Sequence, residues 1–177
     1  KEYRRQRQMC IRDSRKYVVP RRRAQYVPSC NLKASIHLPV MTATASPVVV
    51  MMGDSISTDG ADSQARTVSM WGIIKEKMVA DNPGKSFTFY NRGIGGQTWL
   101  NANTTPNYFP YWYTITSNSW LSYIEALAPD VVILAFGMND SNGFNCGALI
   151  SVVNKIKLFA KVPDIIFVTN PVPAQAA

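Results

Sequence analysis

The sequence feature that most constrains the fold is an unbroken apolar run that stops at a polar turn. Residues 48–52 are Val-Val-Val-Met-Met and are followed by Gly53, Asp54 and Ser55. An apolar run without alternation is typical of a strand buried on both faces, as in parallel sheets covered by helices. Ligands of such sheets bind outside the carboxyl ends of the strands, which would place Ser55 to act on one. The same three residues are also ordinary turn residues, and both interpretations stay open at this point.

Three later segments have the composition of further strands. Residues 86–91 alternate and are rich in aromatic side chains, whereas 130–136 and 165–169 are apolar almost throughout. Apolar residues at helical spacings of three and four separate these strands, in residues 63–80, 120–127 and 148–162. Alternating strands and helices predict an α/β protein, a three-layer α/β/α (flavodoxin-like) sandwich with a parallel sheet. Right-handed crossovers then place the carboxyl ends of the strands at one edge.

The positive charge of the chain is concentrated in its first 46 residues. The formal net charge is +8, yet residues 1–46 hold eleven Lys and Arg against two acids, and residues 47–177 hold eight against nine. Residues 1–46 also lack any sustained period and predict a disordered basic leader. Its residues 6–14 resemble translated adapter sequence, so part of the leader is expected to be non-native. We therefore expect the folded domain at 47–177, nearly neutral and with no nucleic acid as partner.

Other function classes find no support in the sequence. The three cysteines are odd in number and have no C-x-x-C spacing, so we expect neither a metal site nor a disulfide framework. Cys146 is expected near a helix start as a small buried residue. No run of 18 apolar residues or apolar signal core occurs, so no membrane is expected as partner, and no phosphate-binding motif indicates a cofactor. The cellular address stays open, with secretion or a phage tail as options for a longer parent protein.

Polar and glycine-rich residues follow three of the predicted strands. Gly-Asp-Ser at 53–55 ends the first, Asn-Arg-Gly-Ile-Gly-Gly-Gln-Thr at 91–98 follows the second, and Gly-Met-Asn-Asp at 137–140 follows the third. In this order the blocks resemble those of the SGNH hydrolase family, also called GDSL esterases and lipases. The second and third blocks of that family read N-x-G-x-x-G-x-T and G-x-N-D. The resemblance covers residues 47 to about 173 and implies the α/β fold of that family.

The resemblance also implies a role for each block. Ser55 would be the nucleophile, and the Gly96 N–H and the Asn139 side-chain amide would donate hydrogen bonds to the oxygen that becomes negative during acyl transfer. Donors of this kind each contribute about 3 kcal/mol to the transition state. The substrate is expected to lie against Asp54, Gly95, Trp99 and Asp140. For Asp140 a second interpretation stays open, that it caps the helix that follows.

The chain departs from the family at the fourth block, D-x-x-H, which supplies the proton-accepting histidine and the aspartate that orients it. No D-x-x-H occurs here: Asp164 is not followed by a histidine, and the one histidine, His37, lies in the basic leader. We therefore expect a C-terminally truncated fragment, incomplete at its C-terminus. It should have little activity, because its serine lacks a base.

Two functions from different classes follow. The first is serine-dependent hydrolysis of a small-molecule or carbohydrate ester, such as an acetyl group on a sugar, without a cofactor. The alternative is a non-catalytic carbohydrate-binding module of a larger surface or phage-tail protein. The aromatic residues of 101–119 are compatible with both, since they could line a substrate cleft or cover the core; they are Tyr108, Phe109, Tyr111, Trp112 and Tyr113. Nucleic-acid binding would depend on the basic leader alone.

Overall fold

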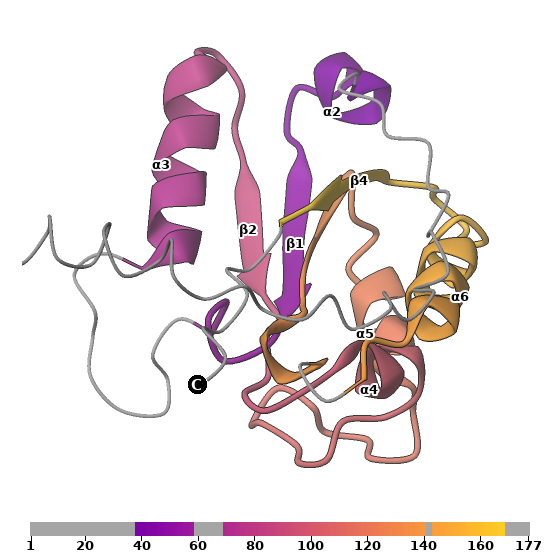
Figure 1. Ribbon diagram of the computed structural model, residues 1–177. Coiled ribbons are helices and arrows are strands. Elements are labelled where there is room, and N and C mark those ends of the chain that lie inside the picture. Colours follow the sequence, from indigo (N-terminus) through magenta and orange to yellow (C-terminus); the bar gives the residue numbers. More distant parts are fainter. Residues whose placement is uncertain (1–37, 59–68, 141–142, 169–177) are drawn as a thin grey trace, which may run out of the picture. The chain divides into compact units, whose positions relative to one another are not determined.

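A four-stranded parallel sheet forms the centre of the domain. The computed structural model describes residues 38–58, 69–140 and 143–168. The strands are β1 (Val48–Gly53), β2 (Thr88–Asn91), β3 (Val131–Ala135) and β4 (Asp164–Phe167), in the spatial order β2-β1-β3-β4 (Figure 1). Every neighbouring pair is parallel, with Gly53 beside Ala135 and Met51 beside Asn91. The predicted parallel α/β fold is confirmed, and the three motif blocks follow strands that end at one edge.

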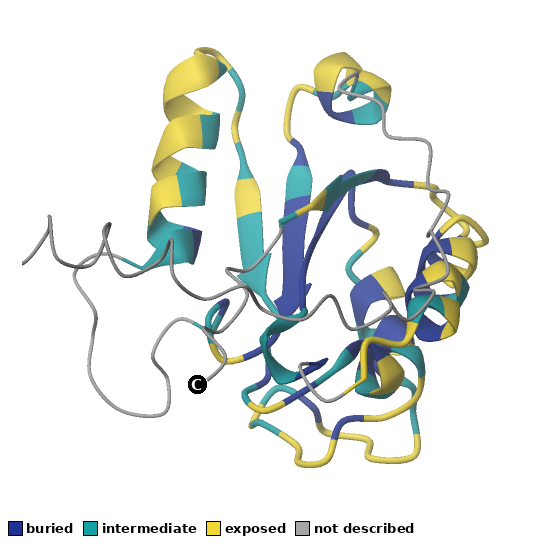
Figure 2. Ribbon diagram, in the orientation of Figure 1, coloured by how far each residue is buried: buried dark blue, intermediate teal, exposed yellow. Residues whose placement is uncertain are grey.

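Helices cover both faces of the sheet. On one face lie α4 (Trp99–Asn103), α5 (Trp120–Glu125) and α6 (Cys146–Ile156), and on the other α2 (Pro39–Ala43) and α3 (Met70–Asp81). Alternate strand residues point to opposite faces: Val50 packs in the cluster that contains Trp120, and Met51 in the one that contains Trp71. Figure 2 shows the buried residues on the central strands and on the inward sides of α5 and α6. The described residues therefore form three layers with an apolar core on each side of the sheet.

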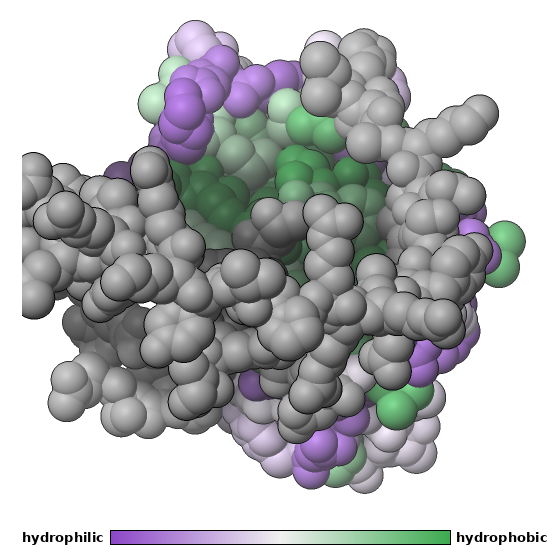
Figure 3. Space-filling view, in the orientation of Figure 1, coloured by the Kyte–Doolittle hydropathy of each residue, from purple (hydrophilic) through white to green (hydrophobic). Residues whose placement is uncertain are grey.

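The second of these cores lies between α3, α2 and the sheet. Its described members include Trp71, Ile74 and Met78, which recur at helical spacing and face the strands, as predicted. Figure 3 shows apolar side chains gathered in this region, beside the polar outer surface of α3. Burial of this apolar stripe stabilises the position of α3 against the edge of the sheet formed by β2.

Side-chain caps decide where the two longest helices begin. Ser69 Oγ accepts the Gly72 N–H at 2.9 Å and starts α3, and Asn145 Oδ1 accepts the Ala148 N–H at 2.8 Å and starts α6. Such caps satisfy backbone donors that have no partner inside the helix. Residues 63–68 of the predicted first helix lie outside the described residues. The helix predicted at 148–162 begins two residues earlier and ends at Ile156.

Two expectations need correction. The predicted leader extends to residue 46, but Pro39–Ala43 forms α2, where the buried Met41 donates its N–H to Asp164 Oδ2 at 2.9 Å. This carboxylate holds the helix against β4, so the ordered domain begins before residue 47. Residues 1–37 lie outside the described residues.

Cys146, at the start of α6, is disulfide-bonded, so the expectation of a cysteine outside any disulfide was wrong. Among the described residues, no helix has the length and apolarity needed to cross a bilayer.

Candidate active site

The turn after β1 carries an exposed serine on a tightly bonded backbone. The Asp54 carbonyl accepts the N–H groups of Ser57 and Thr58 at 3.1 and 3.2 Å and the Ser57 hydroxyl at 2.7 Å. The Asp54 carboxylate accepts the Ile56 N–H at 3.0 Å. Ser55 is exposed, and no described residue forms a hydrogen bond with its hydroxyl. A buried aspartate thus braces the turn and leaves the Ser55 hydroxyl open to a ligand.

The loop after β2 lies directly against this turn. The Ile94 N–H donates to the Gly53 carbonyl at 2.9 Å, and Asn91 Nδ2 donates to the Ser57 carbonyl at 2.7 Å. A β-carbon placed on Gly95 would lie 3.6 Å from Cβ of Ser55, which is ordinary van der Waals contact. Ser55 and Gly95 are therefore immediate neighbours. A larger residue at position 95 would project its side chain toward the serine.

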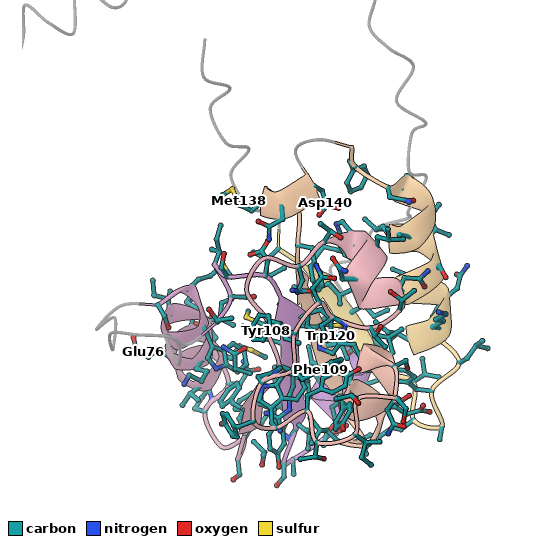
Figure 4. All side chains as sticks on the ribbon, turned by 90° about the horizontal axis from the view of Figure 1, so that it is seen from below. Glu76, Tyr108, Phe109, Trp120, Met138 and Asp140 are labelled. Carbon is teal, nitrogen blue, oxygen red and sulfur yellow. The ribbon has the colours of Figure 1, made fainter. Side chains whose placement is uncertain are left out.

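Gly96, in the loop after β2, and Asn139, after β3, belong to the same group of loops. Gly96 has a φ of +71°, a backbone conformation that L side chains rarely adopt. The short 3-10 helix η1 (Met138–Asp140) follows β3 and carries Asn139, whose Nδ2 donates to the Gln97 carbonyl at 2.9 Å. Figure 4 shows η1 with Met138 and Asp140, and Tyr108 and Phe109 in the loop after α4. The structure thus links the third block to the second, which itself borders Ser55.

Two buried carboxylates lie beneath these loops. Asp54 is 0% exposed and Asp140 is 7% exposed, and Asp140 accepts the Trp99 N–H at 3.2 Å. Burial raises the pKa of the Asp140 carboxyl; the Trp99 N–H lowers it in part, and the neighbouring Asp54 carboxylate raises it again. Asp140 therefore joins η1 to the start of α4, and it does not cap the helix that follows it, α6, which is capped by Asn145.

Trp99 and Gln97 have positions that the sequence did not indicate. Trp99 is 4% exposed, and its ring lies 4.9 Å from that of Phe136, so the side chain belongs to the core. Gln97 is 1% exposed and makes three links: Nε2 donates to the Gly95 carbonyl, Oε1 accepts the Asn107 N–H, both at 2.9 Å, and its own carbonyl accepts the Asn139 amide. A polar side chain inside a glycine-rich block was the only sequence signal for this role.

A cavity of about 490 Å³ opens beside the serine turn. It lies between α3, the end of β2 and the aromatic loop at 101–119, and Tyr108, Tyr111 and Trp112 line it. The Gly95 N–H donates to the Tyr108 hydroxyl at 3.3 Å, so Tyr108 connects the cavity wall to the loop that borders Ser55. Other aromatic residues pack inward, since Tyr113 is 3% exposed and contacts Tyr123. The aromatic loop therefore does both things considered from the sequence: it covers the core and it lines a cavity.

The described residues contain neither a histidine that could act as the base for the serine nor a metal site. The one histidine, His37, lies outside them. Asp164, the only aspartate of the last strand, is committed to the N–H of Met41. No group of three or more His, Cys, Asp or Glu side chains within the described ranges could hold a metal ion. The arrangement supplies a hydroxyl and hydrogen-bond donors, which are parts of an acyl-transfer site.

Comparison with known families supports the class of protein that this fold and site define. Residues 49–166 match the family described as GDSL-like lipase/acylhydrolase. The match covers well over half of the chain, and the protein belongs to the GDSL-like lipase/acylhydrolase family. The resemblance drawn from the three sequence blocks is thereby confirmed. A comparison with the curated proteins gave no match.

Comparison with solved structures gave several matches. A two-domain esterase (CEX) active on acetylated mannans is 23% identical, with a TM-score of 0.51, over 71% of this chain and 30% of that chain. TesA is 21% identical over 71% of this chain and 62% of that chain, with a TM-score of 0.47. Axe2, an acetyl xylan esterase from Geobacillus stearothermophilus, is 20% identical over 68% of this chain and 58% of that chain, with a TM-score of 0.44. The chain spans less than a third of the first of these proteins, and the likeness concerns the fold.

Proposed function

We propose that this domain carries the nucleophile and the oxyanion donors of a serine-dependent ester hydrolase. The observation that carries the proposal is that the exposed Ser55 borders the loop that contains Gly95. The Gln97 carbonyl of the same loop accepts a hydrogen bond from the Asn139 side-chain amide. Ser55 Oγ attacks the carbonyl carbon of the ester, and the carbonyl oxygen becomes negative. The Gly96 N–H and the second N–H of the Asn139 amide stabilise that charge. The alcohol leaves with a proton, and water then releases the acid from the acylated serine.

The substrate class proposed is an acyl or acetyl ester, with an acetylated carbohydrate as the first candidate. The aromatic rings of the cavity offer apolar faces of the kind on which sugar rings pack. A structural neighbour is active on acetylated mannans, and another is an acetyl xylan esterase. Asp54, Gly95 and Asp140 shape the site, whereas the buried Trp99 is left out of the proposed substrate contacts.

The proton acceptor of the serine is proposed to be the histidine of a D-x-x-H segment that this sequence does not contain. A serine without such a base stays protonated and is a weak nucleophile. The 177 residues alone are accordingly proposed to have little hydrolytic activity.

The test is hydrolysis of p-nitrophenyl acetate by the protein extended along its own reading frame through the next D-x-x-H. We expect turnover that Ser55→Ala reduces to the background rate. Ser151→Ala, on α6 and away from the serine turn, is the matched control and should retain activity. Unchanged turnover in Ser55→Ala would show that residue 55 is not the nucleophile.

The second candidate is a carbohydrate-binding module without catalysis. The aromatic cavity favours it, because binding needs the cavity and not the serine. If the extended protein bound an acetylated saccharide, failed to hydrolyse it, and bound equally well as Ser55→Ala, the binding module would be the better description.

A further inference from the structure

Within the described part of the chain, the charged side chains that line the cavity beside the serine turn have one sign. Two charged side chains line it among the described residues: Lys75 from α3 and Arg92 from the loop after β2, both cationic. The remaining described lining is aromatic or uncharged, and includes Trp71, Trp112 and Tyr111. A concave site with aromatic walls and cations of one sign concentrates anions.

Of the two cationic side chains, Arg92 is the one whose guanidinium is held in position by several contacts. Its guanidinium carbon lies 4.9 Å from the ring centroid of Trp112 and 5.1 Å from that of Tyr90. One of its N–H groups donates to the Asn91 carbonyl at 3.1 Å, and within the described ranges no carboxylate forms an ion pair with it. Arginine has five N–H donors. The aromatic rings thus hold a half-buried guanidinium whose remaining donors have no acidic partner in the described part of the chain.

A half-buried charge is costly unless an opposite charge neutralises it. Guanidinium pairs best with planar anions, above all carboxylates, through two parallel hydrogen bonds. The neighbouring aromatic rings favour a ligand that also has a ring with an apolar face. A volume of about 490 Å³ is large enough for one or two sugar rings.

We propose that this cavity binds a sugar ring that carries a carboxylate, with the carboxylate on Arg92 and the ring between Trp112 and Tyr108. Tyr108 lines the cavity and accepts the N–H of Gly95, the neighbour of Ser55, so the cavity adjoins the loop that borders the proposed nucleophile. For an ester hydrolase this makes the preferred substrate an acylated acidic saccharide, a part of the proposal that depends on the proposed function. The binding itself does not depend on it.

The test measures binding to the 177-residue chain and needs no catalysis. Methyl glucuronoside and methyl glucoside differ in one respect, a carboxylate in place of a hydroxymethyl group, and titration of tryptophan fluorescence reports on Trp71 and Trp112 in the cavity wall. We expect the glucuronoside to bind at least about 10-fold more tightly than the glucoside. Equal affinities would overturn the proposal. So would free acetate binding as tightly as the glucuronoside, because the ring would then contribute nothing.

Substitutions locate the carboxylate. Arg92→Gln should remove the preference for the glucuronoside, and Arg92→Lys should keep only part of it, because a lysine lacks the paired donors. Lys77→Gln is the control: it removes one positive charge from the same helix as Lys75, but Lys77 is exposed and paired with Asp81. A preference that persists in Arg92→Gln would overturn the proposal. If Arg92→Gln does not fold, the comparison of the two sugars on the unaltered chain still decides.

Ser55→Ala separates this inference from the proposed function. It should bind the glucuronoside with unchanged affinity. Glucuronoside binding by a protein that proves not to be an esterase would leave the cavity assignment standing. An active esterase that does not prefer the glucuronoside would overturn the cavity assignment alone.

Discussion

The amide of Asn139 has two N–H groups, and one of them is already bonded to the Gln97 carbonyl. That bond restricts rotation of the side chain, so the second N–H has a defined direction. Oriented donors of this kind need no rearrangement as charge develops on the substrate, which is the main source of their effect on rate. The second N–H of the Asn139 amide is therefore oriented before a substrate binds.

Asn139→Ala should accordingly lower kcat of the extended enzyme by about 100- to 1,000-fold, with a much smaller change in KM. The effect falls on kcat because the lost hydrogen bond forms mainly in the transition state. Steady-state kinetics with p-nitrophenyl acetate measure it. Asn154→Ala, at an exposed position of α6, should leave both constants unchanged. A loss confined to KM would contradict the role proposed for the amide.

Asp130 illustrates at the level of the elements how the sheet is held together at the end opposite the site. It directly precedes β3, and its carboxylate accepts the Val48 N–H at 2.9 Å and the Thr44 hydroxyl at 3.2 Å. Lys161, in the segment before β4, forms an ion pair with the same carboxylate at 2.7 Å. One buried side chain thus joins the start of β1, the start of β3 and the connection into β4.

The pKa of Asp130 reflects these bonds. Burial alone raises it, but the hydrogen bonds from Lys161, Val48 and Thr44 together outweigh burial and lower it below its ordinary value of 3.8. A folded-state pKa below the unfolded one means that the ionised group stabilises the fold. That contribution is present above the unfolded-state pKa and is lost as the pH falls through the lower, folded-state pKa.

Asp130→Asn should therefore reduce the free energy of unfolding by about 2 kcal/mol at neutral pH. Urea denaturation at a series of pH values measures this, and the difference from the unaltered protein should shrink as the carboxylate becomes protonated. Asp81→Asn is the control, since that exposed pair with Lys77 is worth at most about 1 kcal/mol. A cost that did not vary between pH 7 and pH 3 would show that the charge of Asp130 is not what matters.

The sequence predicts some of these elements better than others. Strands β1 and β3 were predictable because their apolar runs reflect burial on two faces, a property of the residues themselves. Helix α2 was not, because Pro39–Ala43 is too short to show a period and its position depends on a hydrogen bond to a residue more than a hundred positions away. The boundaries of α3 and α6 depend on capping by Ser69 and Asn145, which is a local choice among several polar residues.

At the scale of the whole molecule, the meeting of the three loops was predictable and their bonding was not. Parallel strands end at one edge, so blocks that follow β1, β2 and β3 must be near one another. The sequence could not indicate that Gln97 connects two of them, that the Trp99 ring lies in the core, or that Cys146 is disulfide-bonded. Each of these depends on contacts between distant positions. The catalytic roles of Ser55, Gly96 and Asn139 stay predictions until activity is measured.

The proposed lack of a base can be tested on the 177-residue chain itself. A fluorophosphonate reacts with activated serines, and added imidazole can supply the missing proton acceptor. We expect slow labelling of Ser55 that imidazole accelerates at least about 10-fold, measured by mass spectrometry of the labelled peptide. Ser151 should stay unlabelled under the same conditions. Rapid labelling of Ser55 without imidazole would contradict the proposal, because it would mean that the chain already contains a working base.

The position of Gln97 has a consequence for protein engineering. Its side chain supports the aromatic loop through Asn107, while its main chain orients Asn139. Grafting a foreign loop in this region to alter selectivity would thus disturb the Asn139 amide as well, the proposed oxyanion donor. Directed evolution of this scaffold should find variants with new preferences and undiminished turnover more readily at Tyr111, which is 87% exposed at the outer rim of the cavity.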